Sequence, residues 1–325
     1  MPRNVYLNGR IVPAESATLS VFDAGFLHGA STFTTMLAHN GKVFRLERHL
    51  ERLMDTVALL SLRTNATASS LTAGVYELLT ANGLGAGGPA APGEIDGAGD
   101  DQSVNLADED HEPRSTVTAD AASSAGPPDA RLRITLTPGS PQGGPPTVLI
   151  TAEPVPPPPD YWYTKGLTVI VTSFKQAKAD PTFGYKTGCY LPRVLARQEA
   201  AGKGADEALW YTWDGRLAEA CFNNVFLVLQ GKVFTPPRDT PVLPGIVRQA
   251  VLELCGELGI PCECEQPLSV REMLDAEEIF LTGSTSGLRP VVRVERHAVG
   301  NEQPGPVTRR LMDAYRRLLE AECPL

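Results

Sequence analysis

The chain has 325 residues, of which 42% are hydrophobic, and a formal net charge of −9 at pH 7. This length predicts two domains, and the hydrophobic content is that of a globular protein. The acidic balance argues against a nucleic-acid surface. No apolar stretch approaches the roughly 20 residues that cross a bilayer, and the N-terminus lacks the apolar run of a signal peptide. We therefore expect a soluble, cytoplasmic protein.

The first residues of the chain predict a small α/β domain spanning residues 1–152. Val5–Val12 has the pattern of a hairpin with Asn8-Gly9 at its turn. Leu46–Leu60 carries leucine and valine at helical spacing, and a second helix is expected after Ser70, as its cap, ending near Gly83. We expect Phe26–Gly41 to form a loop. Strands are predicted at 131–137 and 147–152.

An acidic segment at 85–129 interrupts this first domain. It holds ten acidic residues and a single basic one, Arg114, so it accounts for the entire net charge. It is rich in Gly, Ala and Pro and has no aromatic residue, so it cannot bury enough apolar surface to offset its ordering entropy. The composition predicts a disordered insertion, and an acidic interaction arm is the alternative.

Four consecutive prolines in 153–160 predict a stiff linker between the domains. The second domain, 161–325, is expected to mix strands and helices without a regular βαβ repeat. The predicted strands are 167–172, 208–212, 224–229 and 278–282, and the predicted helices are 191–201, 246–258 and 307–321. The six cysteines lack disulfide-scaffold density, and the C-x-C pair Cys262 and Cys264 has no second ligand pair nearby, so we expect no metal site.

One lysine, Lys186, lies among aromatic and small residues in the stretch FGYKTGCYLPR, just before a predicted helix. Farther along, Glu219 begins EACFNNVF, followed by a V-x-T and then by L-x-G-I-x-R ending at Arg248. Taken alone, Lys186 reads as a surface lysine and Glu219 as a solvated charge at a strand end. The combined pattern has so many fixed positions that it argues against both readings.

This pattern resembles the signature of class IV pyridoxal-phosphate aminotransferases, a group that includes branched-chain aminotransferases, D-amino-acid aminotransferases and aminodeoxychorismate lyases. The resemblance covers most of both domains and skips the acidic insertion. It implies the two-domain α/β fold of the D-amino-acid aminotransferase type, with pyridoxal 5'-phosphate (PLP) in a cleft between the domains. It also implies a homodimer that transfers an amino group from an amino acid or amine to a 2-oxo acid.

The resemblance assigns a role to each matching residue. Lys186 matches the lysine that forms a Schiff base with the cofactor and moves the substrate's α-proton, and Glu219 matches the carboxylate facing the ring nitrogen. Burial among Phe183, Tyr185 and Tyr190 would disfavour the charged form of Lys186. The remaining matches are Tyr190 at the phenolic oxygen and, at the phosphate, Arg52, Ser284 and the amides of Ile246 and Val247 at a helix start.

Residues that select the substrate depart from the family pattern. Pro138 stands where relatives often have an arginine, and the expected glutamate and arginine after Phe33 are missing. His28 and Thr285 are the candidates for substrate contact, although His28 also fits a loop residue without a catalytic role. A lyase that releases pyruvate from aminodeoxychorismate is the alternative function, and a fold relative that has lost catalysis is a third.

Overall fold

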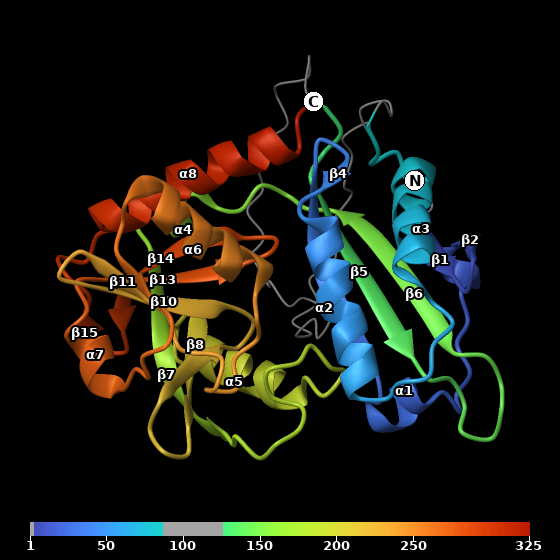
Figure 1. The fold of residues 1–325 in the computed structure, drawn as a ribbon, viewed down its shortest axis with the longest axis horizontal. Helices are drawn as coiled ribbons and strands as arrows, with labels where there is room; N and C mark the ends of the chain where they lie inside the picture. The colour runs from blue at the N-terminus through green and yellow to red at the C-terminus, as the bar shows by residue number, and fades with distance from the viewer. Residues whose placement is uncertain (1–2, 87–125) are drawn as a thin grey trace. The chain divides into compact units, whose positions relative to one another are not determined.

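The computed structural model describes residues 3–86 and 126–325, so most of the acidic segment 85–129 lies outside the described residues. The chain divides into two compact units, Met1–Pro157 with Glu320–Leu325, and Pro158–Leu319. Each unit is built on its own β-sheet (Figure 1). The predicted α/β fold class is confirmed, while the predicted domain bounds stay a prediction. No helix in the described part of the chain is long and apolar enough to span a membrane.

The first unit contains a six-stranded antiparallel sheet in the order β2-β1-β6-β5-β3-β4. The hairpin predicted at its start is confirmed: β1 and β2 flank Asn8 and Gly9, which both have positive φ. A buried cluster of leucine, valine and isoleucine side chains joins the sheet to helices α2 and α3. The elements of this unit are β1 (Asn4–Leu7), β2 (Arg10–Pro13), η1 (Ala14–Ser16), α1 (Ala24–His28), β3 (Thr32–His39), β4 (Lys42–Val43), α2 (Leu46–Leu59), α3 (Ala68–Ala81), β5 (Ala130–Thr137) and β6 (Thr147–Pro154).

Two local predictions for this unit are wrong. The cap of α3 is Thr67, whose hydroxyl accepts from the amide of Ser70, while the Ser70 hydroxyl accepts from the amide of Thr67. Ser70 therefore lies in the first turn of the helix, as the partner in a capping box. The segment Phe26–Gly41, expected as a loop, contains the end of α1 and the whole of β3. Strand β3 is buried almost throughout, and its Thr and Phe residues suit a strand.

Asp23 holds the start of α1 against the ends of β5 and β6. Its side chain accepts from the hydroxyls of Thr137 and Thr147, each at 2.7 Å, and from the amide of Gly25 at 2.7 Å. The side chain is buried, and burial alone would raise the pKa of this carboxyl, but these hydrogen bonds outweigh it, so the pKa is lowered from 3.8. Asp23 is thus an anion that ties three elements together.

We expect Asp23→Asn to lower the free energy of unfolding by about 2 kcal/mol at pH 7, because an amide replaces an anion that accepts three hydrogen bonds. The folded-state pKa is depressed, so this stabilisation is present above the unfolded-state pKa and is lost as the pH falls through the folded-state value. Urea unfolding at pH 7 and pH 3 measures both effects, with Asp55→Asn on the exposed face of α2 as the control. An equal loss at both pH values would contradict this role.

The second unit contains a nine-stranded mixed sheet, whose main path is β12-β11-β10-β13-β14-β7-β8-β9, with β15 paired to β14. Strand β7 lies between β14 and β8 and is parallel to both. The elements are α4 (Asp160–Thr164), β7 (Leu167–Gln176), α5 (Leu191–Gly202), β8 (Glu207–Thr212), β9 (Leu217–Ala220), β10 (Asn224–Leu229), β11 (Lys232–Phe234), α6 (Ile246–Leu258), β12 (Cys262–Glu263), α7 (Val270–Leu274), β13 (Glu278–Gly283), β14 (Gly287–Val294), β15 (His297–Ala298) and α8 (Pro306–Glu322).

The predicted strands and helices of this unit are present, with ends that shift by a few residues. Strand β10 and helix α6 have the predicted bounds. Two short connections position polar side chains: β9 and β10 are joined through Cys221–Asn223, and β13 and β14 through Ser284–Ser286. Because Asn224 at the start of β10 pairs with Thr282 near the end of β13, the first connection ends beside the place where the second begins. Polar residues of the candidate active site lie around these two connections.

Candidate active site

Lys186 is buried in the connection between β7 and α5, with 8% of its surface exposed. Its Nζ donates to the hydroxyl of Tyr190 at 3.0 Å. The Tyr190 ring is in turn stacked on Phe222, with ring centroids 5.7 Å apart and an interplanar angle of 15°. A lysine placed this way is no surface residue, because it is buried and its amine is held by the phenol of Tyr190.

Glu219, on β9, is surrounded by hydrogen-bond donors and is 2% exposed. Its Oε1 accepts from Arg193 Nη2 at 2.5 Å and from Gln176 Nε2 at 3.2 Å. Its Oε2 accepts from the amide of Leu243 at 2.9 Å and from Asn224 Nδ2 at 3.5 Å. The reading of Glu219 as a solvated strand-end charge is therefore wrong: the side chain is a buried carboxylate fixed from four directions.

Arg193 is the cation that sequence reasoning missed at this site. It closes the quoted stretch FGYKTGCYLPR, but nothing in its local sequence indicates a partner 26 residues away. Burial alone would lower the pKa of its guanidinium, yet the neighbouring Glu219 carboxylate outweighs burial, so the pKa is raised and the side chain stays charged. A buried and charge-assisted ion pair is thus part of the site.

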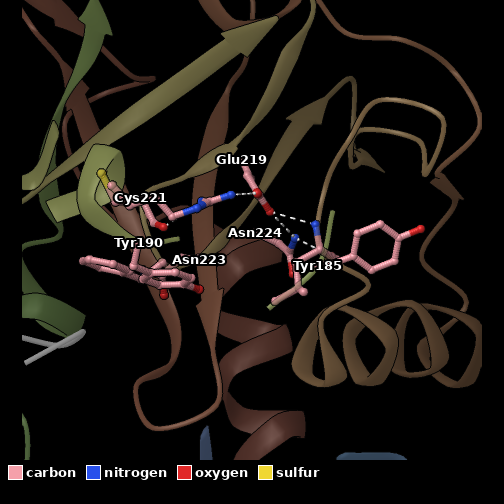
Figure 2. Close-up of a pocket in the computed structure, with 9 residues that line it drawn as sticks. Tyr185, Tyr190, Glu219, Cys221, Asn223 and Asn224 are labelled. Atoms are coloured by element: carbon pink, nitrogen blue, oxygen red, sulfur yellow. Dashed lines mark hydrogen bonds and ion pairs between the residues drawn. The ribbon is translucent and has the colours of Figure 1, made fainter. Parts of the chain in front are cut away.

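These residues line one pocket of the second unit. Figure 2 shows Glu219 and Asn224 facing each other there, with dashed lines meeting at the Glu219 carboxylate and Tyr190 to one side. The lining residues are Tyr185, Tyr190, Arg193, Glu219, Cys221, Phe222, Asn223, Asn224 and Leu243. The pocket therefore combines aromatic walls with a fixed carboxylate and lies beside the segment that carries Lys186.

The backbone comes close to this pocket at two glycines. A Cβ on Gly245, which caps α6 and precedes Ile246, would collide with Asn224 Oδ1. A Cβ on Gly283, which precedes Ser284 and Thr285, would lie 2.5 Å from Asn223 Oδ1. Within the described residues, α6 has no side-chain cap, so its first amides remain available to an anion. The structure thus brings both predicted phosphate-binding segments next to Asn223 and Asn224.

Two predicted site residues, Arg52 and His28, belong to the first unit. Arg52, on α2, donates from Nη2 to Thr34 Oγ1 at 3.2 Å, and that hydroxyl also lies 2.9 Å from His49 Nδ1. His28 is exposed and is the last residue of helix α1, so its interpretation as a loop residue is wrong. Lys186 belongs to the other unit, Pro158–Leu319.

Cys221, in the middle of the signature, is not a nucleophile. It is fully buried and accepts from the Trp210 indole at 3.4 Å. Burial raises the pKa of its thiol well above 9.0, so the thiolate is suppressed. No cluster of three or more metal-ligating side chains is found in residues 3–86 and 126–325.

The profile of the family described as amino-transferase class IV matches residues 31–294. The chain is a class IV aminotransferase. It is similar to a putative branched-chain-amino-acid aminotransferase of Methanocaldococcus jannaschii, with 28% identity over 96% of this chain and 95% of that protein. It is also similar to the branched-chain-amino-acid aminotransferase of Salmonella typhimurium, with 27% identity over 98% of this chain and 93% of that one.

Solved structures of branched-chain aminotransferases are also similar to this chain. The branched-chain aminotransferase of Escherichia coli superimposes with a TM-score of 0.79 at 25% identity, over 98% of this chain and 94% of that one. That of Thermoproteus uzoniensis, crystallised with norvaline, gives a TM-score of 0.79 at 26% identity, over 99% and 96%. The predicted family, fold and transaminase class are confirmed. The comparisons favour the aminotransferase over the aminodeoxychorismate lyase.

Class IV aminotransferases depend on PLP, and the residues of this pocket fit that cofactor. The ring nitrogen needs a fixed carboxylate, and Glu219 is one. The aldehyde needs a buried amine, and Lys186 is one. The phosphate needs an uncapped helix start, which α6 has in the part of the chain described here. The side chains therefore satisfy the main chemical demands of the group.

Proposed function

We propose that this aminotransferase acts on branched-chain or similarly apolar amino acids, with a 2-oxo acid as acceptor. The observation that carries the chemistry is a buried Lys186 beside a pocket whose Glu219 carboxylate is fixed by four donors. The substrate class rests on the relatives, which are named as branched-chain aminotransferases. D-amino acids and amines are the other donors that the family resemblance allows.

When bound, PLP supplies an electron sink for the substrate's α-carbon. Lys186 Nζ holds the cofactor and then removes and returns the α-proton, and the 3.0 Å contact with Tyr190 fixes its direction. Glu219 keeps the ring nitrogen protonated. Ser284 and the first amides of α6, at Ile246 and Val247, bind the phosphate.

Arg52, Tyr190, His28 and Thr285 complete the proposed assignment. Arg52 supplies a cation for the phosphate, and its link through Thr34 to His49 supports a fixed guanidinium. Tyr190 hydrogen-bonds the phenolic oxygen of the cofactor. His28 and Thr285 contact the substrate, and Thr285 follows Ser284 in the same short connection.

We also propose a cytoplasmic homodimer. The six cysteines, all of which lie in the described part of the chain, form no disulfide, which suits a reducing compartment. Dimerisation follows from the family resemblance, in which loops of one subunit complete the pocket of the other.

A donor and acceptor screen tests the substrate class. We expect leucine, isoleucine and valine with 2-oxoglutarate to give kcat/KM values at least about tenfold above those of alanine, D-alanine and simple amines, because discrimination by one or two methylene groups has about that size. Aminodeoxychorismate without an acceptor is the control for lyase activity. Pyruvate release in that control, or a preference for D-amino acids, would contradict the proposal.

A further inference from the structure

Arg193 is held in place independently of Glu219. Its Nη1 donates to the carbonyl oxygens of Ala220 at 3.2 Å and Cys221 at 2.7 Å, while Nη2 binds Glu219. Its Cζ lies 5.7 Å from the ring centroids of both Tyr190 and Trp210. The side chains of Arg193 and Glu219 are only 11% and 3% exposed. Backbone and aromatic contacts therefore help to keep the cation beside the carboxylate.

The four acceptor positions of the Glu219 carboxylate are not equally filled. A carboxylate offers about four such positions. On Oε1, Arg193 and Gln176 are donors at 2.5 and 3.2 Å. On Oε2, the Leu243 amide is a donor at 2.9 Å, but Asn224 Nδ2 is 3.5 Å away and lies closer, at 2.9 Å, to the carbonyl oxygen of Leu243. The acceptor position on Oε2 that faces Asn224 is therefore the one that another donor can take over with the smallest loss of hydrogen bonding.

We propose that Arg193 is a positioning residue that shares the charge of Glu219 with the ring nitrogen of PLP. It occupies Oε1 and leaves Oε2 for the nitrogen, and its positive charge weakens the hold of Glu219 on the proton there. The sign follows from Coulomb's law, because two cations on one carboxylate repel each other, and burial limits the screening of that repulsion. This inference rests on the proposed use of PLP.

The binding of two probes isolates this effect. One probe is PLP, and the other is its 1-deaza analogue, in which carbon replaces the ring nitrogen. The ratio of the two dissociation constants, analogue over PLP, measures what the nitrogen contributes. General damage to the pocket weakens the binding of both probes by the same factor, so this factor cancels in the ratio.

We expect Glu219→Gln to lower this ratio towards one and Arg193→Met to raise it about tenfold above wild type. Arg193→Lys, which keeps the charge, should stay within about threefold of wild type. Lys203→Met is the matched control, since it removes an exposed cation paired with Glu199 at the end of the same helix, and its ratio should not change. Arg193→Gln, also neutral, replaces the methionine variant if that protein does not fold.

Two results would overturn the inference. A fall in the ratio for Arg193→Met would mean that the arginine only orients the Glu219 carboxylate and does not weaken its hold on the ring-nitrogen proton. An unchanged ratio would mean that it only anchors helix α5 to Ala220 and Cys221. Failure of the proposed assignment of this pocket to PLP looks different, because the wild-type protein would then bind neither probe.

Discussion

Glu219→Gln is expected to keep PLP bound to the protein and to slow turnover by two to three orders of magnitude. An amide cannot hold the ring-nitrogen proton, and breaking a buried ion pair by removing one partner costs about 3–5 kcal/mol. Each 1.4 kcal/mol or so that falls on the transition state is worth a factor of about ten in rate. The measurement is kcat with a saturating amino donor, on protein whose bound cofactor has been quantified.

Glu278→Gln is the matched control for this substitution. Glu278 is also a buried carboxylate of the second unit, where it accepts from the amides of Val307 and Thr308 at the start of α8. Replacing this carboxylate by an amide should lower the melting temperature of the protein and leave kcat within about threefold of wild type. If Glu219→Gln turned over like wild type with cofactor bound, its assignment to the ring nitrogen would be wrong.

Lys186→Ala is expected to abolish covalent attachment of PLP and to reduce turnover by at least about four orders of magnitude. The substitution removes both the amine that holds the cofactor and the group that moves the α-proton, and general base catalysis alone contributes about 10²–10⁴. Visible absorption of the dialysed protein reports attachment, and single-turnover kinetics report the proton step.

Lys178→Ala controls for the loss of a lysine in the same connection, because that side chain is exposed. It should keep the visible absorption and the turnover of wild type. A Lys186→Ala protein that stayed yellow after dialysis, or lost less than tenfold in rate, would show that another lysine holds the cofactor.

Local patterns predicted the parts of the fold that local interactions determine. Helix α6 has the predicted bounds because Gly245 precedes it and Gly259, with positive φ, ends it. The sequence alone does not identify the cap of α3, because Thr67 and Ser70 both fit, and only their reciprocal hydrogen bonds distinguish them. Strand β3 was missed because burial on both faces of the sheet leaves it without the alternation that identifies a strand.

The site was predictable only where the family resemblance names a residue. Lys186 and Glu219 were found that way, but the donors that fix Glu219 were not. Gln176 and Arg193 lie 43 and 26 residues from it in the chain, so only the pairing of β7, β8 and β9 and the position of α5 bring them together. Such contacts have no local sequence signal.

Borohydride reduction of the wild-type protein with PLP, followed by peptide mapping, locates the lysine that holds the cofactor. We expect one phosphopyridoxyl group per chain, on Lys186, in a peptide that includes Tyr185 and Thr187. A label on a different lysine, or no label after reconstitution with PLP, would contradict this assignment.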